Sequence, residues 1–169
     1  MIDIKTFLHG LPAFERFNER QINALIDRLR IETHAPGTVL FRQDEQAPAL
    51  YIIMSGVLQM HHQGLTDSEN GDGTRESHAG EVVGHLALVP NMPSPSTCTA
   101  VGEVTVASLT YDDYNALFLL APAVAHQFQY MVATQLAHYL QDQNKSLSQH
   151  LDNQRPAASR SFLERLLGA

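Results

Sequence analysis

Residues 36–56, PGTVLFRQDEQAPALYIIMSG, decide the fold expected for this chain. Pro36-Gly37 and Ser55-Gly56 are dipeptides typical of tight turns, because glycine tolerates the backbone angles that such turns require. Between them, aromatic and aliphatic positions alternate as they do in half-buried strands. The stretch therefore predicts short β-strands joined by tight turns.

Segments of the same kind recur along the chain. They are rich in β-branched and aromatic residues and are separated by proline, glycine and acidic turns. They comprise TVLF (38–41), LYIIM (50–54), VLQMHH (57–62) and EVTVASL (103–109). Evenly spaced short strands are typical of a sandwich or barrel. The polar segment 63–77 is expected to be a long hairpin connection.

Helical patterns lie on both sides of the strands. Residues 18–30 carry apolar side chains at helical spacing, and Asn18 is a suitable N-cap. After the strands, Asp112 and Asp113 are expected to cap a helix that ends at Leu120.

A long helix is expected from Pro122 to about His150, roughly 40 Å at 1.5 Å per residue. Its apolar stripe includes Val132, Leu136, Leu140 and Leu147. A long helix on a compact β unit often packs against a second copy of itself. We therefore expect a homodimer, the alternative being that the first half packs on its own domain and the second half frays.

Composition limits the class of protein. With 169 residues and 44% hydrophobic content, the chain can bury one core, which we place in residues 1–151. The net charge of -7 argues against DNA binding by this chain alone. A lone Cys98 excludes an internal disulfide. Neither a signal peptide nor an apolar run long enough to span a bilayer is evident, so we expect a cytoplasmic protein that does not enter the membrane.

The end of the chain, 152–169, is expected to be a linker followed by a short amphipathic tail. Residues Ser159 to Leu167 read SRSFLERLL, too short for a stable helix without a surface to bind. Such a surface could lie on the same domain, on the other subunit or on a different protein.

Taken in order, these features resemble the cyclic-nucleotide-binding domain of catabolite-activator-type transcription factors, protein kinase A regulatory subunits and cyclic-nucleotide-gated channels. The resemblance covers about residues 8–150, and its motifs are LPAF (11–14), the stretch 36–56, AGEVVGHLAL (79–88) and the run 92–100. It implies a mainly β, α+β fold: an antiparallel, jelly-roll-like β-roll with N-terminal helices and a long C-terminal helix. The alternative is another β-roll, such as a cupin.

The resemblance also implies where a nucleotide would bind. In the family, a Gly-Glu-x-Ala-Leu turn opens a short helix whose N–H groups point at the cyclic phosphate. Gly84, Leu86, Ala87 and Leu88 match that turn. The family's glutamate, which binds the ribose 2'-hydroxyl, falls at His85.

Residues 84–87 and 94–97 together make up the phosphate-binding cassette that the resemblance implies. Its second part, 94–97, departs further from the family. The arginine that neutralises the phosphate falls at Ser94, and the next position, which commonly supplies an N–H, is Pro95. Thr97 alone keeps the hydroxyl expected near the end of the motif, and Ser96 would line an open pocket together with His85 and Thr97. Losing the guanidinium contact removes about 1.5–3 kcal/mol, and each other lost contact about 1 kcal/mol or more. Together these losses predict that micromolar recognition of cyclic AMP or cyclic GMP fails.

Two functional hypotheses follow. The first is a dimeric module in regulation that binds a protein partner and needs no cofactor. A helix-turn-helix after the long helix would need roughly 50 more residues, so something else is expected to read out its state. The alternative is a sensor of a different small ligand, such as a cyclic dinucleotide. Tyr139 and Leu140, the expected pocket lid, would stack on a base in the sensor or fill an emptied site in the interaction module, and the filling role is favoured.

Catalysis and metal binding are not expected. The chain has nine histidines, and the neighbours His61 and His62 point to opposite faces of a strand. No Cys-x-x-Cys, His-x-His or Glu-x-x-His spacing is present. Cys98 has no basic neighbour in sequence, so we expect a small buried residue rather than a nucleophile.

Overall fold

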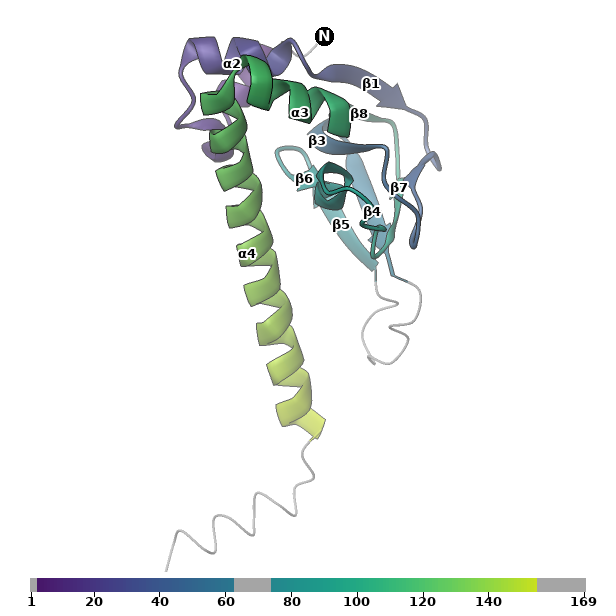
Figure 1. Ribbon diagram of the computed structural model, residues 1–169. Helices are drawn as coiled ribbons and strands as arrows, with labels where there is room; N and C mark the ends of the chain where they lie inside the picture. The colour runs from purple at the N-terminus through teal and green to yellow at the C-terminus, as the bar shows by residue number, and fades with distance from the viewer. Residues whose placement is uncertain (1–2, 63–73, 155–169) are drawn as a thin grey trace, which may run out of the picture. The chain divides into compact units, whose positions relative to one another are not determined.

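The computed structural model describes residues 3–62 and 74–154 (Figure 1). It divides into two compact units, 1–129 and 130–169, and the boundary expected at residue 151 stays a prediction. The helices and 3-10 helices are α1 (Ile4–His9), η1 (Pro12–Phe14), α2 (Glu19–Ile26), η2 (His85–Leu88), α3 (Tyr111–Leu120) and α4 (Pro122–Gln154). The strands are β1 (Arg30–His34), β2 (Val39–Phe41), β3 (Ala49–Ser55), β4 (Val57–His61), β5 (Thr74–His78), β6 (Val82–Val83), β7 (Thr97–Ala100) and β8 (Val104–Thr110).

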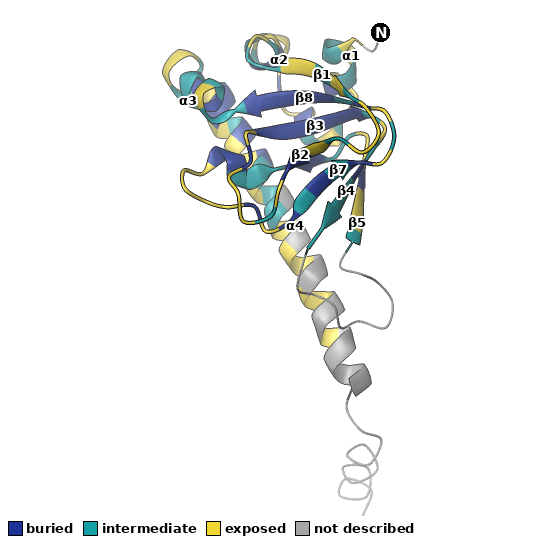
Figure 2. Cartoon of the chain, turned by 90° about the vertical axis from the view of Figure 1, so that its right-hand side faces the viewer, coloured by how far each residue is buried: buried dark blue, intermediate teal, exposed yellow. Residues whose placement is uncertain are grey.

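The strands form two four-stranded sheets, ordered β1-β8-β3-β6 and β2-β7-β4-β5, in which all pairs are antiparallel. Central strands β3 and β8 are almost wholly buried, as Figure 2 shows in dark blue. The predicted antiparallel β-roll with flanking helices is therefore confirmed. Of the polar connection expected at 63–77, residues 63–73 lie outside the described chain, and β5 begins at Thr74.

An apolar core fills the space between the sheets. Leu58 lies opposite Ala100 across the β4–β7 ladder, and both are at most 1% exposed. Phe41 and Tyr51 stack with ring centroids 6.3 Å apart, and Cys98 is fully buried in the same cluster. Burial of these side chains supplies the main stabilisation of the roll.

Helix α2 begins where the sequence predicts and ends earlier. The Asn18 side-chain oxygen accepts from the backbone N–H of Gln21 at 3.0 Å. In return, the Gln21 side-chain oxygen accepts from the backbone N–H of Asn18 at 2.9 Å. This capping box confirms the N-cap. The helix ends at Ile26 rather than Arg30, because Arg30 opens β1 and pairs with Ser108 of β8. Strand pairing therefore overrides the apolar periodicity near the helix end.

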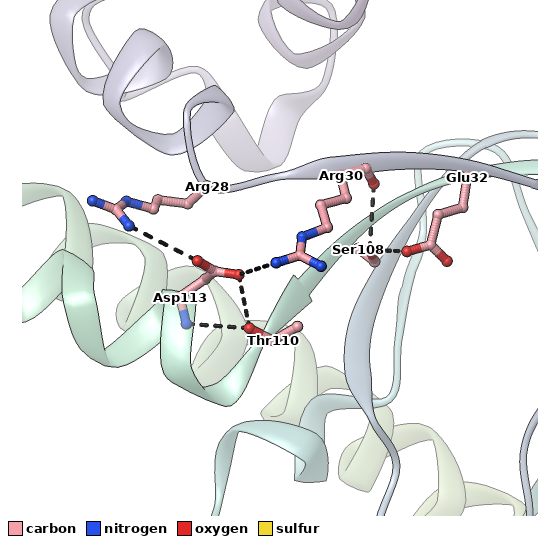
Figure 3. Close-up of polar contacts among 6 residues, drawn as sticks. All are labelled: Arg28, Arg30, Glu32, Ser108, Thr110 and Asp113. Carbon is pink, nitrogen blue, oxygen red and sulfur yellow. Dashed lines mark hydrogen bonds and ion pairs between the residues drawn. The ribbon is translucent and has the colours of Figure 1, made fainter.

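Helix α3 has a different cap from the one expected. Thr110, not Asp112 or Asp113, is the N-cap, and its hydroxyl accepts from the Asp113 amide at 3.2 Å. The same hydroxyl donates to the Asp113 carboxylate, which also lies 3.9 Å from the guanidinium groups of Arg28 and Arg30 (Figure 3). The first turn of α3 is thereby tied to the residues just before β1 and at its start.

Two turns require glycine because of their backbone angles and their close packing. Gly56 has φ of 85°, and an added Cβ would lie 2.5 Å from the Glu103 carbonyl oxygen. Gly84 has φ of 74°, and its Cβ would lie 2.8 Å from the Ala49 carbonyl oxygen. Any side chain at either position would collide with backbone, so these turns depend on glycine.

Candidate functional site

The first half of the cassette is a short 3-10 helix packed into the roll. Gly84 precedes η2 in a left-handed conformation, and its carbonyl accepts from the Ala87 amide at 2.9 Å. Ala87 and Leu88 are buried, whereas His85 is half-buried at the first position of η2. The turn that the sequence matched to the family therefore forms the expected helix entry.

Ser94, at the family's arginine position, is buried and joined to a distant turn. The residue is 2% exposed. Its amide donates to the Glu45 carbonyl at 2.8 Å, and its carbonyl accepts from the Asp44 amide at 2.9 Å. Both backbone groups of Ser94 are therefore engaged within the protein.

The residues after Ser94 are held in the same manner. The backbone N–H of Gln43 donates to the Thr97 hydroxyl at 3.0 Å. Ser96, between Pro95 and Thr97, is only 9% exposed. The carbonyl of Pro95 contacts Nδ1 of His62. A carbonyl can only accept, so this imidazole carries its proton on Nδ1 when it makes the bond.

Sequence reasoning missed two partners of the cassette, the turn 42–46 and His62. Asp44 and Glu45 are exposed, but their backbone groups pair with Ser94. Backbone pairing between segments 50 residues apart leaves no signal in the residue types. For His62, the alternation of Leu58 and Met60 along β4 was a usable signal, because the next residue of that series is His62.

The proposed lid and dimer residues all lie in the second unit, 130–169. Leu140 is 60% exposed, and Val132 and Leu136 are half-buried. The side chains of Tyr139 and Leu147 and the tail 159–167 lie outside the described part. The lid and the dimer stripe stay predictions.

Among the residues that the structure describes, the histidines and Cys98 form neither a metal-ligand cluster nor an activated thiol. In the described ranges 3–62 and 74–154, no group of His, Cys, Asp and Glu side chains could hold a metal ion. Burial raises the pKa of the Cys98 thiol to about 12, which disfavours the nucleophilic thiolate. In the same ranges, no helix has the length and apolar character needed to cross a membrane.

A family model described as the cyclic nucleotide-binding domain matches residues 31–119, more than half of the chain. The chain belongs to the cyclic nucleotide-binding domain family. The match starts in β1 and ends in α3, so it includes both sheets and the cassette.

Individual relatives agree with this assignment. The chain is 28% identical over 120 residues to the cAMP-dependent protein kinase regulatory subunit of Yarrowia lipolytica, covering 71% of this chain and 30% of the subunit. It is 23% identical over 129 residues to the Cyclic AMP receptor protein of Thermus thermophilus, covering 76% and 59%. It thus spans less than two thirds of either relative. A cyclic nucleotide-binding domain from Methylobacillus flagellatus superposes with a TM-score of 0.68 at 18% identity, covers 86% of this chain and 82% of that one, and shows the same fold.

Proposed function

We propose that this chain is a regulatory module of the family that does not bind cyclic AMP or cyclic GMP in the usual mode. We propose further that it acts as a homodimer in contact with a protein partner, without catalytic activity or direct DNA binding. The observation that carries the proposal is Ser94, a buried serine with both backbone groups engaged at the position where the resemblance places a phosphate-binding arginine.

The cassette offers a phosphate few groups of the right kind. A serine cannot supply the two charged N–H donors of a guanidinium, and the Ser94 amide already donates to Glu45. Pro95 has no N–H at all. His85 replaces the carboxylate that would accept from a ribose hydroxyl, and a neutral imidazole offers a single accepting nitrogen in place of two charged oxygens.

An uncharged stretch of sequence supports association with a second copy. Residues 114–141 contain no Asp, Glu, Lys or Arg, although 17% of the chain is charged. Leu140 in α4 is 60% exposed, and Leu119 and Leu120 at the end of α3 are 85% and 68% exposed. Depletion of charge with exposed large apolar side chains is typical of interface cores. Because the chain has a net charge of -7, contact through uncharged residues avoids bringing like charges of the two copies together.

The alternative, a sensor of another small ligand, would need accessible polar groups in the cassette. Ser96 is 9% exposed, and the Thr97 hydroxyl already accepts from Gln43. Leu88, in the same region, is also buried. These observations favour the interaction module over the sensor.

Calorimetric titration with cyclic AMP, cyclic GMP and cyclic di-GMP, up to high micromolar concentration, tests the proposal. We expect no saturable heat from any of them. The matched control is the triple variant His85→Glu, Ser94→Arg and Pro95→Ala, which restores the family's residues and should recover measurable cyclic AMP binding. Saturable binding of cyclic AMP or cyclic GMP by the wild type would contradict the proposal, and binding of cyclic di-GMP alone would favour the sensor.

A further inference from the structure

The cassette loop between η2 and β7, residues 89–96, is contacted from two sides by the protein itself. On one side is His62, the residue directly after β4, whose Nδ1 contacts the Pro95 carbonyl. This contact joins the end of a strand to the part of the loop where a phosphate donor would be expected.

On the other side is the turn 42–46. Asp44 and Glu45 form a reciprocal pair of backbone hydrogen bonds with Ser94, at 2.9 and 2.8 Å. Farther along, the Gln46 side-chain amide donates to the Val89 carbonyl at 3.2 Å. The loop is therefore held near both of its ends.

The turn itself has an unfavourable conformation. Asp44 has φ of 64°, in the left-handed region, which aspartate adopts more often than most residues but less readily than glycine. Such a conformation persists only where the surrounding structure maintains it. The paired amide of Asp44 is part of what maintains it, so the turn and the loop depend on each other.

We propose that His62 is a positioning residue that latches the cassette loop onto the turn 42–46 and holds it closed without a ligand. The proposal rests on the proposed function, for which it supplies a cause. In the latched loop the Ser94 amide is bound to Glu45, and Pro95 presents a carbonyl to His62 where a phosphate would need a donor. A nucleotide would have to break the latch before it could bind.

Amide hydrogen exchange of the full chain, followed by NMR, tests the latch. The reporters are the amides of Asp44 and Ser94. We expect His62→Ala to raise their exchange rates roughly two- to tenfold, the effect of losing one hydrogen bond. His62→Asn, which places an amide N–H donor at the same distance from the backbone, should restore rates close to wild type.

His61→Ala is the matched control, because His61 is the preceding residue and makes a separate contact, 3.4 Å from the Thr74 hydroxyl. It should leave both reporter amides unchanged. The Ile53 amide, which donates to Glu81 at 3.0 Å, reports any loss of overall stability. A long-range nitrogen–proton correlation spectrum of the wild type should also contain an Nδ1–H imidazole signal that is absent in His62→Ala.

The latch would be overturned if the exchange rates of the Asp44 and Ser94 amides did not change in His62→Ala. It would also be overturned if His61→Ala raised these rates equally, or if the Ile53 amide exchanged faster by the same factor in His62→Ala. Rates in His62→Asn as fast as those in His62→Ala, or a His62 ring without a proton on Nδ1, would overturn it as well. These measurements use no nucleotide. Cyclic AMP binding by the wild type would therefore contradict the proposed function alone and leave the latch standing.

Discussion

Gly84 lies against Ala49, so closely that a Cβ on Gly84 would be 2.8 Å from the Ala49 carbonyl oxygen. This approach sets the start of η2 directly on strand β3. The left-handed φ of 74° at Gly84 adds a second requirement for glycine. The entry to the cassette is thus defined by backbone packing, whatever the cassette binds.

Gly84→Ala should lower the free energy of unfolding by about 2–4 kcal/mol, because strain at positive φ and a backbone collision act together. Gly37→Ala is the control, since Gly37 has φ of 79° but nothing within 4 Å of an added Cβ. It should lose only about 1 kcal/mol. Urea denaturation of both variants measures the difference, and equal losses would show that the contact with Ala49 contributes nothing.

Thr110→Ala should lower the free energy of unfolding by about 1 kcal/mol, because it removes the N-cap of α3. Asp113→Asn should cost less than about 1 kcal/mol, since its ion pairs with Arg28 and Arg30 are 3.9 Å long and partly exposed. Asp112→Asn, at an exposed neighbour without a described bond, serves as the control for charge at the helix start. A cost for Asp112→Asn equal to that for Asp113→Asn would attribute the effect to the helix dipole.

Stability should fall as pH rises from about 9 to about 12. Burial raises the pKa of Cys98 from 9.0 to about 12, and burial followed by the charge of Glu32 raises that of Tyr51 from 10.0 to about 12. Between the ordinary pKa values and about 12, the unfolded chain loses protons that the folded chain keeps. The free energy of unfolding therefore decreases steadily as the pH rises through this range. Denaturation curves across this range should show a shallower decline for Tyr51→Phe. A decline as steep as in wild type would contradict the assignment to Tyr51.

Replacing Leu136 and Leu140 by aspartate should convert the expected dimer to a monomer. Two buried charges in an apolar helix interface cost more than such an interface can supply. Sedimentation equilibrium should give about half the wild-type mass, while Asn144→Asp, at an exposed position of α4, should leave the mass unchanged. A monomeric wild type would contradict the dimer itself, whereas a variant that stays dimeric would place the interface elsewhere.

Local patterns in the sequence determined much of the fold. The alternation in 36–56 and the turn glycines predicted the strands, because side-chain alternation and positive φ are properties of single residues and their neighbours. The start of α2 at Asn18 and the proline at the start of α4 were likewise local signals. Residues 84–88, which the sequence matched to the family's turn, form the start of the short helix η2.

Only the tertiary structure decided how the cassette is held. Ser94 pairs with the turn 42–46 through backbone groups, which are the same in every residue and therefore leave no mark on the sequence. The same reason explains the end of α2, where Arg30 leaves the helical pattern to pair with Ser108. The sequence by itself determined where α2 and α4 begin and where strands β2, β3, β4 and β8 lie. The tertiary structure decided three further features: the burial of Ser94, the contact of Pro95 with His62 and the N-cap at Thr110. Each depends on which of several possible partners reaches a hydrogen-bonding atom when the roll closes.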